Sequence, residues 1–120
     1  MEQTNFDIEQ GATFMADIKI VDADDNPVDL TGTTFRGQVR KTASSDKIYG
    51  VFSFTPTNLA QGMFTVILSA AETSALPCHS SPTAIRTITS FAYDIEAKYS
   101  DGSVERLLSG MLNVSPEVTR

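Results

Sequence analysis

Apolar and polar residues alternate along most of this chain. From Phe14 to Ile20 every second residue is apolar, and Met15, Asp17 and Lys19 stand between them. A period of two predicts a strand with one face in a core and the other in solvent. The same period recurs over residues 35–40, 48–54 and 64–68. These segments are therefore predicted to be consecutive antiparallel strands.

The clearest alternation covers the stretch from Phe91 to Tyr99. Asp101-Gly102 separates it from a further run at 104–108, and this dipeptide between alternating segments favours a type I′ hairpin. Gly110 inside the last strand predicts a bulge there, and Pro116 is expected to end the pairing.

The segments between the strands have their own signals. Ser69-Ala70-Ala71-Glu72 has the capping-box pattern and predicts a short helix near 70–76 that Pro77 ends. The Ser- and Thr-rich stretch 78–90 is predicted to be a long loop, and the polar stretch 41–47 a mobile connection.

The sequence therefore predicts an all-β fold, a single antiparallel β-sandwich of the Ig-like kind with about seven strands and one short helix. A chain of 120 residues fits one domain, 1–120. The aromatic residues expected in the core are Phe14, Phe35, Phe52, Phe54, Phe64, Phe91 and Tyr93.

Charge and cysteine content narrow the function classes. The net charge of −6 argues against a phosphate-tracking surface, so we expect no nucleic-acid partner. Cys78 is the only cysteine, so no intrachain disulfide or CxxC pair is possible. No secretory signal or long apolar run is visible, so we expect synthesis in a cytoplasm and no membrane partner.

The run from Asp22 to Asp29 places oxygen ligands at alternate positions, like the start of a calcium loop. An EF-hand needs Gly at its sixth position and Glu at its twelfth, whereas Pro27 and Thr33 stand there. We therefore expect a solvated acidic turn and no metal or other cofactor.

His79 follows Cys78 directly, which suggests a thiolate–imidazole pair. Catalytic pairs come from separate elements and are oriented by a third group, and adjacent side chains seldom point at each other. We expect a partly buried thiol beside a surface imidazole. No pair of carboxylates stands out either, so the sequence predicts no enzyme.

Arg36, Arg40 and Arg106 lie at polar positions of predicted strands. They are suited to pairing with Asp94 and Glu96 on a solvated sheet face. The same face could instead bind a partner, because Arg is enriched at interface cores. The sequence leaves both interpretations open.

The order of three segments resembles small virion structural proteins of tailed bacteriophages. These are Ile-x-Gln-Gly at 8–11, Pro-Val-Asp-Leu-Thr-Gly at 27–32, and a Tyr-Asp strand at 93–94 that leads to Val-x-Pro-Glu-Val-Thr-Arg at 114–120. The resemblance spans nearly the whole chain. It implies a β-sandwich similar to the N-terminal domain of phage upper-baseplate proteins, located in the virion and made in the host cytoplasm.

The resemblance implies a non-enzymatic adaptor of the tail, baseplate or neck, present in several copies and bound to other virion proteins. Two alternatives are a capsid decoration protein and a carbohydrate-binding β-sandwich. The stretch 78–90 is longer than is typical of the family, so it is a candidate for partner choice. The residues expected to contact a partner are Arg36, Arg40, His79, Ser80, Ser81 and Thr83.

Overall fold

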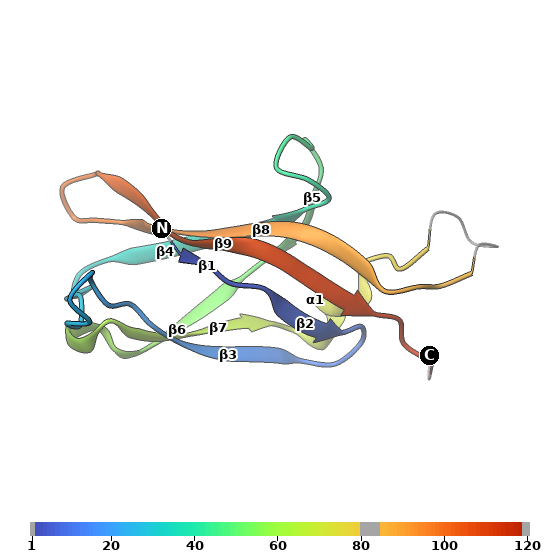
Figure 1. Cartoon of the computed structure of the whole chain (residues 1–120), viewed down its shortest axis with the longest axis horizontal. Helices are drawn as coiled ribbons and strands as arrows, with labels where there is room; N and C mark the ends of the chain where they lie inside the picture. Colours follow the sequence, from blue (N-terminus) through green and yellow to red (C-terminus); the bar gives the residue numbers. More distant parts are fainter. Residues whose placement is uncertain (1, 80–84, 119–120) are drawn as a thin grey trace.

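The computed structural model describes residues 2–79 and 85–118, and it consists of two β-sheets packed face to face (Figure 1). This is the predicted all-β sandwich. Its longest dimension is 48 Å, and the strands of both sheets run roughly along it.

The larger sheet has the strand order β1-β9-β8-β4-β5, with β2 also paired to β9. Its strands are β1 (Glu2–Gln3), β2 (Phe6–Glu9), β4 (Thr34–Arg40), β5 (Ile48–Val51), β8 (Thr89–Lys98) and β9 (Val104–Ser115). β1 and β2 run parallel to β9, and the other pairs are antiparallel. The N-terminal segment thus forms one edge of the larger sheet, which the alternation from Phe14 onward did not predict.

The smaller sheet has the order β3-β7-β6 and is antiparallel throughout. Its strands are β3 (Phe14–Lys19), β6 (Ser53–Asn58) and β7 (Met63–Leu68). A 3₁₀ turn, η1 (Leu59–Gln61), joins β6 to β7, and helix α1 (Ala70–Ser74) follows β7. Exposure alternates residue by residue along β3, as predicted.

The core lies between the two sheets and is rich in aromatic rings. Phe35 stacks on Phe64 with ring centroids 4.4 Å apart, and Phe6 lies 5.6 Å from Tyr93. Phe64 and Phe91 are fully buried, and each such side chain contributes about 1.5–3 kcal/mol by leaving water. The predicted aromatic core is confirmed, with Phe14, Phe35 and Phe54 packed at its margin.

The stretch 48–54 is two strands instead of the predicted one. β5 ends at Val51 in the larger sheet, and β6 begins at Ser53 in the smaller sheet. Phe52 lies between them, only 4% exposed, and its N–H donates to the Gly37 carbonyl at 3.0 Å. Both sheets turn their inner faces to the same core, so the alternation continues through the crossing and does not reveal it.

The hairpin between β8 and β9 forms as predicted, but its turn is not type I′. That turn needs a positive φ at two residues. Gly102 has φ +90°, whereas Asp101 is not among the positive-φ residues of the described chain. The Tyr99 N–H bonds the Ser103 carbonyl and leaves a three-residue loop, the kind in which a type I turn is followed by a left-handed Gly.

Gly110 is not the site of the bulge. The register between β8 and β9 shifts between Ile95 and Glu96, while Tyr93 stays paired with Gly110. Gly110 instead permits a close approach of backbones, because a Cβ there would collide with the Thr4 carbonyl oxygen. Gly110 thus lies beside the segment that joins β1 to β2 at the edge of the sheet.

The predicted capping box is confirmed. Ser69 Oγ accepts the Glu72 N–H at 3.2 Å, and Glu72 Oε1 accepts the Ser69 N–H at 3.1 Å. The helix has five residues, and no helix of residues 2–79 and 85–118 is long and apolar enough to cross a membrane.

The predicted loop 78–90 is too long at its C-terminal end, whereas Cys78 lies outside the helices and strands, as predicted. Cys78 is fully buried, and β8 already begins at Thr89. The Thr87 N–H donates to the Cys78 carbonyl at 2.9 Å and closes the base of the loop. Cys78 and the first residues of β8 therefore belong to the sandwich.

Candidate functional site

A broad groove of about 860 Å³ lies on the outer face of the larger sheet. β4, β8 and β9 form its floor, the N-terminal edge contributes Gln3 and Asn5, and the β4–β5 connection contributes Ala43. Figure 1 shows this connection projecting from the sheet on the side away from the smaller sheet. The groove thus lies where the polar half of each strand's alternation faces solvent.

Two ion pairs cross the floor of the groove. Arg36 Nε lies 2.7 Å from Glu96 Oε1, and these residues are direct partners in the β4–β8 register. Arg106 Nε lies 3.4 Å from Asp94 Oδ2. The Arg36 and Arg106 side chains are 65% and 51% exposed, so each pair contributes at most about 1 kcal/mol to stability. The predicted pairing with Asp94 and Glu96 is confirmed for Arg36 and Arg106 and is wrong for Arg40, which among the described residues forms an ion pair with neither carboxylate.

Arg40, at the β5 side of the groove, forms hydrogen bonds with the β4–β5 connection. Its Nη1 donates to the Ser45 and Asp46 carbonyls at 2.8 and 2.7 Å, and its Nη2 donates to Gln38 Oε1 at 3.1 Å. Arg40 therefore holds the β4–β5 connection in place beside the groove.

Exposed aliphatic side chains stand next to these charges. Ile48 and Val51 of β5 are 44% and 50% exposed, and in the register they face Arg40 and Gln38. Met111 of β9 lines the groove and is 37% exposed. A register shift between Val39 and Arg40 accompanies the outward position of Ile48, which the alternation had assigned to the core face.

The groove differs in charge from the rest of the chain. Its lining includes Arg36, Arg40 and Arg106 against Asp94 and Glu96, which is three positive and two negative charges and leaves +1. The whole chain carries −6. The face is thus a local positive excess on an acidic protein.

The other residues predicted to contact a partner do not line the groove. His79 is half-buried after α1, and its Nδ1 is shielded from solvent and bonds none of the described residues. Ser80, Ser81 and Thr83 lie outside the described residues. Of the six predicted residues, the structure brings together Arg36 and Arg40.

Cys78 is more deeply buried than the sequence suggested. Its thiol donates to the Val114 carbonyl, with Sγ 3.6 Å from the oxygen. Burial raises the pKa of this thiol, which disfavours the thiolate that a nucleophile needs. The residue is a small apolar part of the core.

The acidic run forms a tight turn. Asp22 Oδ1 accepts the N–H groups of Asp24 and Asn26 at 2.9 and 3.0 Å, and an isolated bridge pairs Val21 with Pro27. Within the part of the chain that the structure describes, no three His, Cys, Asp or Glu side chains are grouped so as to hold a metal ion. The turn is explained by its own backbone hydrogen bonds.

Gln10 and Gly11, from the first segment of the phage resemblance, lie beside helix α1 and the C-terminal segment at one end of the sandwich. Gln10 Nε2 donates to the Leu76 carbonyl at 2.9 Å, and Gln10 Oε1 accepts the Glu117 N–H at 2.9 Å. The Gly11 N–H donates to Thr73 Oγ1 at 3.0 Å. One amide side chain therefore ties the β2–β3 turn to both α1 and the C-terminal segment.

Several groove residues could not be singled out from the sequence. Gln38, Ala92 and Met111 sit at outward positions of three different strands, and only the strand order places them side by side. Gln3 and Asn5 join the groove because the N-terminal segment adds to the β9 edge. The alternation indicated which residues of each strand face solvent, but it did not indicate which strands lie side by side.

No protein-family model matches the sequence, and no curated protein matches it. Solved structures with a similar fold include CopC from Methylosinus trichosporium OB3b, at 11% identity and a TM-score of 0.43, over 96% of this chain and 89% of CopC. Murine CRIg is similar at 6% identity and a TM-score of 0.40, over 94% of this chain and 92% of CRIg. Both are distant likenesses of fold alone.

Proposed function

We propose that this protein is a non-enzymatic structural adaptor of a tailed-phage particle, in the tail, baseplate or neck. In this proposal the groove on the outer face of the larger sheet docks onto another virion protein. The assignment to a phage particle is based on the order of the three sequence segments that resemble phage virion proteins.

The observation that carries the proposal is where residues of the first and third of those segments lie. Gln10 and Glu117 are hydrogen-bonded to each other at one end of the sandwich, and Tyr93 bonds the N-terminal edge through the Thr4 carbonyl. Gln10, Tyr93 and Glu117 thus help to hold the two terminal segments on the sandwich. This use of a motif supports a structural module in preference to a catalyst.

The make-up of the groove supports docking. Arginine and methionine are enriched in protein interfaces, and Arg36, Arg106 and Met111 line the groove. The exposed Ile48 and Val51 of the neighbouring strand β5 are paired with Arg40 and Gln38 of the groove. Asp94 and Glu96 are engaged with arginines, an arrangement that orients guanidinium groups for recognition.

Quantitative mass spectrometry of purified particles of the phage that encodes the sequence tests the location. We expect a few to a few dozen copies per particle. Hundreds of copies would favour the alternative of a capsid decoration protein, and absence from the particle would overturn the proposal.

The docking face is tested by incorporation of variants into particles. Arg36→Glu changes the groove, and Lys19→Glu makes the same charge change on β3 in the smaller sheet, where Lys19 is exposed. We expect reduced incorporation of the first variant alone. Equal incorporation of both variants would remove the groove from the interface.

A further inference from the structure

We infer that the groove receives the acidic turn of a second copy of this chain, so that copies associate head to tail. The inference deepens the docking role proposed above and rests on it. The acidic turn is defined here as residues 22–29. The contact joins the end of one molecule to the side of the next.

Charge complementarity is the first step. The acidic turn carries Asp22, Asp24, Asp25 and Asp29, and the sequence has no Lys or Arg between Lys19 and Arg36. All four aspartates are exposed, and neither ion pair of the described residues involves them. The net charge of the chain is negative, so the groove's excess of +1 is best matched by this end of another copy.

The available guanidinium donors are the second step. Arg36 uses its Nε for Glu96, and no described residue accepts a hydrogen bond from its Nη groups. With its side chain 65% exposed, Arg36 presents this fork to solvent above the floor of the groove. A fork of this kind binds a carboxylate through two parallel hydrogen bonds.

The shape of the turn is the third step. Hydrogen bonds from Asp25 N–H to the Asp22 carbonyl and from Asp22 N–H to the Asn26 carbonyl, at 3.0 and 2.9 Å, fold it back on itself. A turn that is already ordered loses little conformational entropy on binding. The groove's 860 Å³ lies within the roughly 300–1,000 Å³ of pockets that enclose a ligand, which is room for the tip of such a turn.

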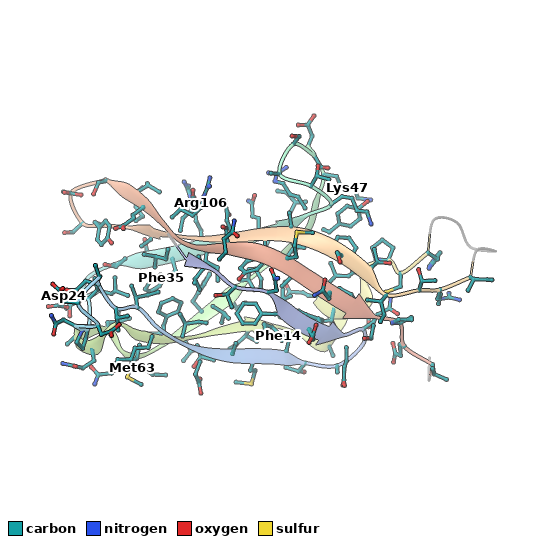
Figure 2. The ribbon with its side chains drawn as sticks, in the orientation of Figure 1. Phe14, Asp24, Phe35, Lys47, Met63 and Arg106 are labelled. Carbon is teal, nitrogen blue, oxygen red and sulfur yellow. The ribbon has the colours of Figure 1, made fainter. Side chains whose placement is uncertain are left out.

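No residue of the acidic turn lines the groove of its own molecule, although Arg106 also borders a second pocket beside Asp22 and Ala23. Figure 2 shows Asp24 at one end of the long axis and Arg106 on the outer side of the larger sheet. A contact between unlike surfaces is heterologous, and it continues from copy to copy until a ring closes or a filament forms. Such a contact suits a protein that is used in several copies.

Sedimentation velocity of the purified full chain tests the inference without any virion. We expect species larger than a dimer at about 0.01 M salt, and dissociation toward monomers near 1 M salt, where charges are screened within about 3 Å. A protein that stays monomeric at low salt overturns the inference. One that stops at two copies also overturns it, because a head-to-tail dimer still has an unused groove and an unused turn.

Two neutral variants make the test specific. Arg36→Gln alters the groove, and Asp24→Asn with Asp25→Asn alters the turn; Asn suits Asp25, whose φ is +63°. Each variant alone should associate about tenfold more weakly or worse. Lys19→Gln, and Asp7→Asn with Glu9→Gln, make the matched charge changes outside both surfaces and should associate normally.

Mixing the groove variant with the turn variant gives the decisive reading. One retains an intact turn and the other an intact groove, so the mixture should form a one-to-one dimer that does not grow. No heterodimer, or equal loss in the control variants, overturns the inference. The chain could fail to self-associate while Arg36→Glu still lowers incorporation into particles. That result would overturn this inference but would leave the docking proposal intact, with a different protein in the groove.

Discussion

The Tyr93 hydroxyl donates a hydrogen bond to the Thr4 carbonyl at 2.5 Å, across 89 positions of the chain. Tyr93 is paired in register with Gly110, and the absence of a side chain at Gly110 lets the Thr4 backbone reach the ring. The bond anchors the N-terminal segment where β1 gives way to β2, at the edge of the sheet that bears the groove.

Tyr93→Ala should lower the free energy of unfolding by about 3–5 kcal/mol, the range for emptying a large aromatic site in a core. Tyr93→Phe keeps the packing and should cost about 1 kcal/mol through the lost hydrogen bond. Denaturant titration measures both. Glu96→Ala, at an exposed ion pair, should stay within about 0.5 kcal/mol, and a larger cost there than at Tyr93 would reverse the assignment of sheet faces.

Gly110→Ala should destabilise the fold by about 1–3 kcal/mol, because the new methyl group would press on the Thr4 carbonyl. Gly50→Ala is the matched control in another strand. A Cβ at Gly50 would lie 3.7 Å from Val39 Cγ2, an ordinary contact, so that variant should be close to neutral. Equal melting temperatures for the two variants would contradict the close approach at Gly110.

Tyr99 should ionise late in an alkaline titration followed by tyrosinate absorbance. Its hydroxyl donates to Glu105 Oε2 at 2.7 Å, and this bond, with burial and the Glu105 charge, raises the pKa of Tyr99 to about 12. Glu105→Gln should bring that pKa down toward its ordinary value of about 10. Glu96→Gln should leave the titration of Tyr99 unchanged.

The raised pKa of Tyr99 has a consequence for stability. The phenol binds its proton more tightly in the folded chain, so its contribution is fully present below about pH 10, the ordinary tyrosine pKa. It is lost as the pH rises through about 12. Unfolding free energies measured across this window should fall less steeply for Tyr99→Phe, and a parallel fall would contradict the assignment.

Calcium should not change the melting temperature. Asp22 Oδ1 already accepts two backbone N–H groups, and the run lacks the Gly and Glu of a strong calcium loop. A ligand at 100 times its dissociation constant would add about 2.7 kcal/mol, which is several degrees for a domain of this size. A reproducible shift in millimolar calcium, removed by chelator, would falsify this account of the turn.

Cys78 should react with thiol reagents only when the chain opens. Its side chain is fully buried, and burial raises its pKa, so both access and the thiolate fraction are low. Labelling in native buffer should be slow and should speed up in denaturant in step with unfolding. Rapid labelling of the native protein would place the thiol at the surface.

The alternation of residues by itself determined the class of fold and most of its inner face. Phe91, Tyr93 and Ile95 alternate with polar residues, and a strand must turn such residues to opposite sides. The Ser69–Glu72 capping box likewise depends on residues within one helical turn. These interactions depend only on residues close together in the sequence, so they were predictable.

The tertiary structure alone decided which strands are neighbours. The inner faces of both sheets contact the same core, and Phe52 is buried there between β5 and β6. The alternation of apolar residues therefore gave no sign that the chain crosses from one sheet to the other at this point. Gly110 could mark a bulge or a close approach, and only the position of Thr4 selected the second. The groove has the same origin, because Arg36 of β4, Glu96 of β8 and Asn5 of the N-terminal edge meet through long-range pairing whose order no local pattern encodes.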